Sequence, residues 1–145
     1  MSFWEGIITN RAISLPIFSW FVAQLYKFIV CFITNKKVDF KKFVSAGGMP
    51  SSHSAISVCL ASVLGIQYGF DSGVFALSVI FSLVVMADAA GVRRAAGKQA
   101  EVLNKLVNSS KHFRLEKDLK ELLGHTPVQV FVGAALGILV AIIFA

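Results

Sequence analysis

The chain has 145 residues, a formal net charge of +6, an apolar fraction of 56% and a mean hydropathy of +0.72. The length indicates one domain, and the hydropathy exceeds that of an ordinary soluble domain. The positive charge does not favour a nucleic-acid partner, because it is concentrated in two connections between apolar stretches. We therefore predict a single membrane domain over 1–145.

Four apolar stretches are long enough to cross about 30 Å of hydrocarbon, which takes roughly 20 helical residues. They cover 15–34, 54–68, 74–88 and 128–145, and the second and third are short. The first follows a polar start at Asn10 and Arg11 without a small-residue cleavage site after it, so we expect a retained helix. The predicted fold is all-α, a polytopic bundle of about four transmembrane helices.

The basic residues lie mainly in the connections 35–50 and 92–124. With four spans both connections are on one side, so the positive-inside rule predicts that they face the cytoplasm and that both termini are outside. Leucine and valine recur at helical spacing over 102–107 and 115–123, which predicts amphipathic helices within the second connection.

The first chemically informative segment runs directly into the second span. Gly48 and the glycine before it let backbone amides approach a ligand closely, and Pro50 is suited to the first helical position. Ser51, Ser52 and His53 would then lie at a helix N-terminus, where free N–H groups and the helix dipole favour an anion such as phosphate. Capping explains the serines but not the histidine beside them.

A second segment repeats this arrangement at the start of the fourth span. Thr126 can cap the helix and Pro127 can open it, which places His125 at the membrane boundary. Two of the three histidines, His53 and His125, therefore occupy matching helix starts on one side, whereas His112 lies in a polar stretch and is expected to be a solvated loop residue.

Charged residues also occur at one end of the third span and inside the first. Asp88 is followed by Arg93 and Arg94, and arginine presents a planar fork that matches phosphate oxygens. Lys27 and Gln24 fall within the first span, where an ionisable side chain is costly and suggests function. A purely structural role, in which the Lys27 side chain reaches toward the cytoplasm, is an equally weighted alternative. If the role is functional, Asp88 is the expected partner of Lys27.

Three motifs in order resemble the divergent branch of the type-2 phosphatidic-acid phosphatase family, which is related to bacterial acid phosphatases and vanadium haloperoxidases. They are Gly-Gly-Met-Pro-Ser-Ser-His-Ser-Ala at 47–55, Asp-Ala-Ala-Gly-Val-Arg-Arg at 88–94 and Leu-Leu-Gly-His-Thr-Pro at 122–127. The resemblance extends over nearly the whole chain from about Gln24 and implies a lipid-phosphate phosphatase.

The resemblance also implies roles for the two histidines. His125 would be the nucleophile that forms a phosphohistidine, and His53 would protonate the leaving group. Gln129 stands where the superfamily has an aspartate, and an amide can orient an imidazole without stabilising an imidazolium by charge. Glu121 and Asp88 are the alternative carboxylate partners of His125.

The implied mechanism requires no metal ion or other cofactor. The groups expected to hold the phosphate are Arg93, Arg94, Lys42, Gly48, Ser51 and Ser52. The expected substrate is a phosphomonoester lipid of the phosphatidylglycerophosphate or phosphatidic acid type, hydrolysed on the cytoplasmic face of a bacterial-type inner or plasma membrane. Two alternatives stay open: a non-catalytic lipid-phosphate or pyrophosphate binder or transporter, and a small structural subunit. A thin bundle of short spans is expected to form a homodimer.

Overall fold

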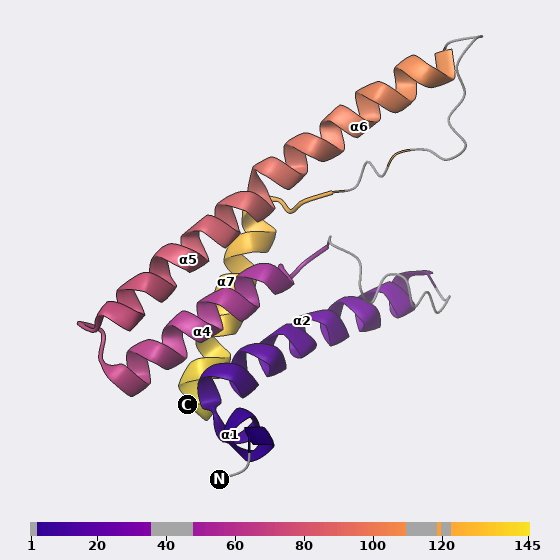
Figure 1. Cartoon of the computed structure of the whole chain (residues 1–145). Helices are drawn as coiled ribbons and strands as arrows, with labels where there is room; N and C mark the ends of the chain where they lie inside the picture. Colours follow the sequence, from indigo (N-terminus) through magenta and orange to yellow (C-terminus); the bar gives the residue numbers. More distant parts are fainter. Residues whose placement is uncertain (1–2, 36–47, 110–118, 120–122) are drawn as a thin grey trace.

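Helix α4 (Ser52–Tyr68) lies at the centre of the structure, where it packs against α2 (Arg11–Asn35), α5 (Gly73–Ala90) and α7 (Pro127–Phe144) (Figure 1). Two further helices, α1 (Phe3–Thr9) and α6 (Val92–Ser109), extend from the ends of this group. The computed structural model describes residues 3–35, 48–109, 119 and 123–145. These residues form helices and no strand, so the predicted all-α fold is confirmed.

Three segments have the length and composition to cross a membrane: Arg11–Thr34, Gly73–Ser109 and Pro127–Phe144. The predicted stretch 54–68 lies in α4, which has 17 residues and rises about 25 Å, close to the lower limit for a span. Small side chains dominate its buried positions, so its neighbours pack closely around it. The chain is thus a helical membrane bundle with α4 as its inner helix.

Glycines on α7 bring its backbone against the start of α4. A Cβ atom at Gly133 would collide with the carbonyl oxygen of Ser51, and one at Gly137 would lie 2.5 Å from the carbonyl oxygen of Ala55. Small residues four apart are typical of close helix crossings in membranes. This crossing holds the first turn of α7 beside the first turn of α4.

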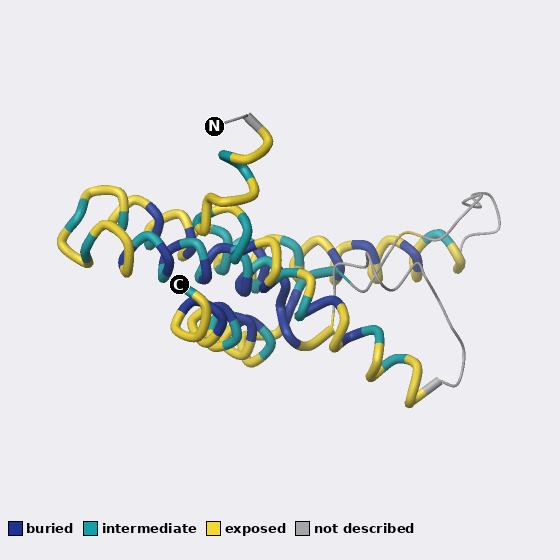
Figure 2. Tube along the Cα trace, turned by 90° about the horizontal axis from the view of Figure 1, so that it is seen from below, coloured by how far each residue is buried: buried dark blue, intermediate teal, exposed yellow. Residues whose placement is uncertain are grey.

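Helix α6 follows α5 after Gly91 and runs on in nearly the same direction (Figure 1). The backbone bonds Gly91 N to Ala87 O, 2.8 Å, and Ala95 N to Gly91 O, 2.9 Å, continue the helical pattern across the junction. Most of α6 is exposed, as Figure 2 shows. The predicted helix over 102–107 therefore lies in α6, whereas the one over 115–123 falls largely outside the described residues, as does His112.

Both termini lie at the end of the bundle that also holds the α4–α5 turn (Figure 1). Arg11 donates a hydrogen bond to the carbonyl oxygen of Ala145, which joins the start of α2 to the end of α7. The starts of α4 and α7 and the end of α5 lie at the opposite end. That this end faces the cytoplasm stays a prediction.

Candidate active site

His125 is held at the junction of α5, α6 and α7 by its backbone. It is 2% exposed, and its amide donates to the carbonyl oxygen of Ala89 over 2.8 Å, at the end of α5. The preceding Gly124 has a φ of +84°, and a Cβ atom there would lie 2.5 Å from the backbone nitrogen of Arg94. A side chain at position 124 would therefore be strained and would push this segment away from the first turn of α6.

Gln129 contacts the imidazole of His125 from the first turn of α7. Its Oε1 atom lies 3.3 Å from Nδ1 of His125 and accepts the amide of Thr126 over 3.0 Å. Because an amide oxygen only accepts, Nδ1 carries the proton and Nε2 keeps its lone pair. Nε2 is buried and has no hydrogen-bond partner among the described residues. The arrangement leaves one nitrogen of His125 available for a ligand.

The predicted start of α7 is confirmed, because Thr126 is the N-cap of a capping box and Pro127 occupies the first turn. The predicted start of α4 is wrong by one feature. Ser51 is the N-cap and the helix begins at Ser52, so Pro50 precedes the cap instead of opening the helix. The side-chain oxygen of Ser51 accepts a hydrogen bond from the amide of Ser54. A proline has no side-chain oxygen and could not cap the helix in this way.

The first turns of the two helices are joined directly. The amide of Ser51 donates to the carbonyl oxygen of Gln129 over 2.9 Å, so Ser51 fastens α4 to α7. Its amide is then engaged and its side chain fully buried. Of the serines expected at the phosphate, Ser52 is the one whose hydroxyl contacts another expected site residue, Lys27, over 3.4 Å.

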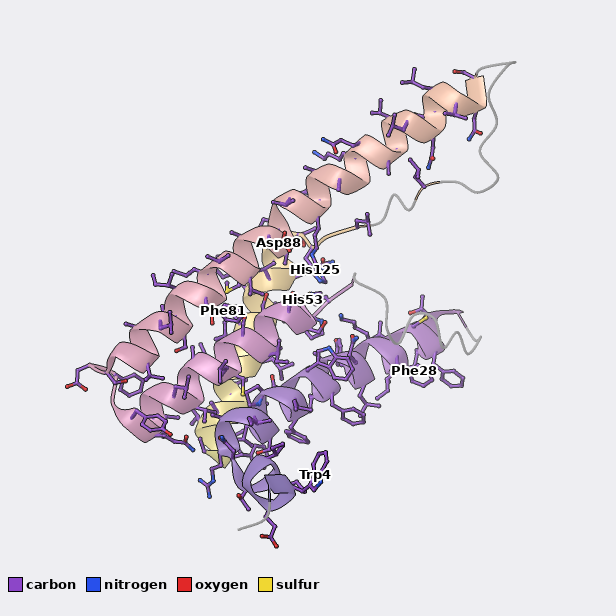
Figure 3. All side chains as sticks on the ribbon, viewed as in Figure 1. Trp4, Phe28, His53, Phe81, Asp88 and His125 are labelled. Atoms are coloured by element: carbon purple, nitrogen blue, oxygen red, sulfur yellow. The ribbon has the colours of Figure 1, made fainter. Side chains whose placement is uncertain are left out.

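His53, in the first turn of α4, faces His125 across a short gap. The ring centroids are 6.0 Å apart with an interplanar angle of 61°. Nη1 of Arg93 lies 3.4 Å from Nε2 of His53, and Nε of Arg93 donates to Asp88 over 2.7 Å. Figure 3 shows His53, His125 and Asp88 together where α4, α5 and α7 converge. The structure thus assembles two histidines, an arginine and its carboxylate partner.

Lys27 approaches the same place from α2. It is 9% exposed and contacts Ser52, whereas Asp88 is paired with Arg93. The expected Lys27–Asp88 pair is therefore wrong. Gln24, one turn before Lys27, is 3% exposed, and its Oε1 atom has no hydrogen-bond partner among the described residues.

The other predicted residues have different positions. Gly48, with a φ of +82°, lies over the stem of Lys27, since a Cβ atom there would be 3.9 Å from its Cδ atom. The side chain of Arg94 is exposed. Lys42 and Glu121 lie outside the described residues. Asp88, one alternative partner of His125, contacts Arg93 instead, and Gln129 takes that place.

Burial and positive charge set the protonation of His125. Burial lowers its pKa below the ordinary value and the positive charge of Lys27 lowers it further, although contacts with Gln129 and with the backbone of Gly48 partly oppose this shift. The imidazole is consequently neutral at physiological pH, which is the form that can act as a nucleophile. Within the described part of the chain, no group of three or more His, Cys, Asp and Glu side chains could hold a metal ion.

Several contributors to this geometry were missed from the sequence. The carbonyl of Ala89 and the link between Ser51 and Gln129 are backbone interactions, which side-chain motifs do not reveal. The spacing of Gly133 and Gly137 was readable, and it indicates a close helix crossing. That spacing could have predicted that α7 packs against another helix, though not which one.

The fold and the site together define an integral membrane protein with paired histidines at one end of a helical bundle. The family model described as "Divergent PAP2 family" matches residues 8–140, so the chain belongs to this family. It is also similar to the uncharacterized membrane protein YuiD of Bacillus subtilis (strain 168), with 41% identity over 152 residues, covering 96% of each chain. No solved structure matches the chain.

Proposed function

We propose that this protein is a membrane lipid-phosphate phosphatase that works through a phosphohistidine on His125. The observation that carries the proposal is the state of that ring: Gln129 holds Nδ1, while the buried Nε2 is unpaired within the described structure and His53 lies across a short gap. Membership of a family related to phosphatases supports the same chemistry.

The phosphate group would bind between the two rings. Arg93 and Lys27 supply positive charge from α6 and α2. For Lys27 this is the functional one of the two roles that were open from the sequence. The first-turn amides of Ser52 and His53 add donors, because the first amides of a helix have no intrahelical acceptor. These groups hold equatorial oxygens and stabilise the charge of the transition state. Asp88 positions Arg93.

In the first step, the Nε2 lone pair of His125 attacks phosphorus and the bond from phosphorus to the lipid oxygen breaks. His53 gives its proton to the departing lipid oxygen. Burial and the charge of Arg93 lower the pKa of His53, whereas the bound negative phosphate would act in the opposite direction and favour the protonated ring. The lipid alcohol leaves, and His125 carries the phosphoryl group on Nε2.

In the second step, a water molecule attacks the phosphohistidine. Neutral His53 accepts a proton from this water, the bond between phosphorus and Nε2 breaks, and inorganic phosphate leaves. His125 regains its lone pair and His53 is protonated again for the next cycle. Gln129 keeps Nδ1 protonated throughout, so the same nitrogen acts in each cycle.

A phosphomonoester lipid of the phosphatidic acid or phosphatidylglycerophosphate type fits this mechanism. A site near the ends of membrane helices suits a headgroup at the bilayer surface, and the basic connections 35–50 and 92–124 support a cytoplasmic orientation. Anionic headgroups are also attracted to basic segments next to the membrane.

The test is phosphate release by the purified protein from a panel of lipid phosphates, measured with malachite green and with vanadate as competitor. We expect release from phosphomonoester lipids, inhibition by vanadate and no activity in His125→Ala. A matched variant, His53→Ala, should accumulate an acid-labile phosphohistidine with an activated aryl phosphate, whose leaving group needs no proton. Release from no lipid phosphate would refute the proposal.

Gln129 favours one alternative, a lipid-phosphate binder or transporter without catalysis, because an amide stabilises an imidazolium less than a carboxylate does. The same panel separates the two functions. A binder would retain vanadate-sensitive lipid binding, which His125→Ala weakens, and would release no phosphate.

A further inference from the structure

A groove of about 410 Å³ lies between α4, α5 and α7, and its lining reaches Phe70 in the α4–α5 turn. Its walls include Ala61 on α4, Val79 and Leu83 on α5, and Ile138 on α7. These helices are the ones whose ends carry His53, Asp88 and His125. The groove is therefore built on the same scaffold as the candidate active site.

The groove presents an apolar surface even where serines line it. The Ser62 hydroxyl donates to the carbonyl oxygen of Val58 over 2.9 Å, and the Ser82 hydroxyl donates to that of Ser57 over 2.7 Å. Their donor hydrogens are thus satisfied within the bundle. Such a surface favours hydrocarbon and disfavours a polar ligand, which would find few partners there.

The residues of α5 that line the groove extend from near the site end of the helix to the α4–α5 turn. Met86, a lining residue, lies two positions before Asp88. At the other end the rings of Phe70 and Phe75 pack edge to face, with centroids 5.2 Å apart. They rest on Gly65, where a Cβ atom would lie 2.7 Å from the Phe70 ring. The two rings therefore mark the far end of the groove, where Phe70 is still 67% exposed.

The length of the groove suits one acyl chain. From Asp88 back to Phe75, α5 rises about 20 Å at roughly 1.5 Å per residue. Half of a hydrocarbon core is about 15 Å thick. A chain attached to a headgroup at the histidines would pass the midplane and reach Phe70 and Phe75, and no part of its path would leave the hydrocarbon region.

We propose that this groove binds an acyl chain of the lipid whose phosphate occupies the site between His53 and His125, with Phe70 and Phe75 contacting the chain terminus. The inference rests on the proposed function for the identity of the headgroup. Because lipid tails are as apolar as the groove, the tail gains little by transfer from the bilayer. The groove therefore acts by shape, and it aligns the phosphate with His125.

The direct test is photolabelling of the full-length protein in bilayers, which needs no turnover. Two phosphatidic acid probes carry a diazirine, one at mid-chain and one at the chain terminus, and a phosphatidylcholine carries it at the terminus as the control lipid. We expect the mid-chain probe to label the region of Leu83 and the terminal probe to label Phe70 or Phe75. Vanadate should reduce both, since it displaces the headgroup.

A pair of neighbouring variants tests the groove by its shape. Leu83 lines it, whereas Val84 does not, and both side chains are more than half exposed, at 54% and 63%. Leu83→Trp should lower labelling by the phosphatidic acid probes about fivefold or more. The larger ring would take up space that the acyl chain needs, and overpacking of this kind costs about 1 kcal/mol or more. Val84→Trp should leave labelling unchanged. A soluble phosphate ester without a tail should be hydrolysed equally by both variants.

Outcomes for the groove and for catalysis are distinct. Vanadate-sensitive labelling of the groove supports the inference whether or not phosphate is released, and absence of release counts against the proposed function alone. Equal labelling by phosphatidylcholine would overturn the inference, because the groove would then hold bulk lipid. Labelling spread over outward positions such as Leu77, or equal loss in both tryptophan variants, would overturn it as well.

Discussion

Replacing Gln129 by leucine tests the arrangement that makes His125 a nucleophile. The change removes the acceptor of the Nδ1 proton, at 3.3 Å, and the acceptor of the Thr126 amide, at 3.0 Å. Losing the first contact costs about 1 kcal/mol, which is roughly a fivefold smaller population of the reactive tautomer. Misorientation of the ring adds to this, so we expect kcat to fall by about ten- to a hundredfold.

Two companion variants separate orientation from helix capping. Thr126→Ala removes the N-cap hydroxyl and should cost about 1 kcal/mol of stability, yet it leaves the Gln129 oxygen in place, so kcat should stay near wild type. Gln129→Glu keeps an acceptor of the same reach and adds a negative charge, so it should restore or raise kcat.

The assay is phosphate release from the best lipid substrate of the panel, with thermal unfolding in detergent measured on the same samples. If Gln129→Leu and Thr126→Ala lose stability equally and both keep wild-type kcat, then Gln129 only caps the helix. The assignment of Nε2 of His125 as nucleophile would then lose its main support.

Three further predictions follow from the site and its scaffold. Burial and a nearby positive charge lower the pKa of His125. Protonation removes the lone pair, so the decrease of kcat/KM in acid should have its midpoint below about pH 6.5. A midpoint above that value would contradict the role of His125 as nucleophile. Gly133→Ala should destabilise the bundle by about 1–3 kcal/mol, because the added methyl group overpacks against α4. The control Ala135→Val, on the exposed face of α7, should leave the melting temperature unchanged. Equal melting temperatures for the two variants would refute the close crossing. Arg93→Lys should lower kcat/KM about tenfold, since lysine lacks the fork that contacts both Asp88 and phosphate, and an unchanged value would remove Arg93 from the site.

The helix starts show how far local patterns reach. Thr126 and Pro127 have the spacing of a capped helix, and that pattern depends on the neighbouring backbone alone, so the start of α7 was predictable. Pro50 has the same local preference but lies before the cap, because Ser51 must both cap α4 and donate to Gln129 of α7. A contact between distant segments decided that position.

The partners of the charged residues depended on how the helices turn and pack. Asp88 was a candidate partner for Lys27 and for His125, since all three were expected near one end of the bundle. The turn from α5 into α6 brings Arg93 to Asp88 within 2.7 Å, whereas Lys27 contacts Ser52 and His125 contacts Gln129. The order of residues along the chain does not indicate the contact between Lys27 and Ser52.

Membrane residence, helical class and the helix-end location of both histidines came from hydropathy and capping patterns, because these depend on neighbours within a turn or two of the chain. The sequence also contained the two glycines of α7 at helical spacing. The tertiary structure decided which helices cross, which nitrogen of His125 is free and which residues surround the groove. Those features depend on backbone approach between segments far apart in the chain, where a single Cβ atom or one hydrogen bond determines which side chains meet.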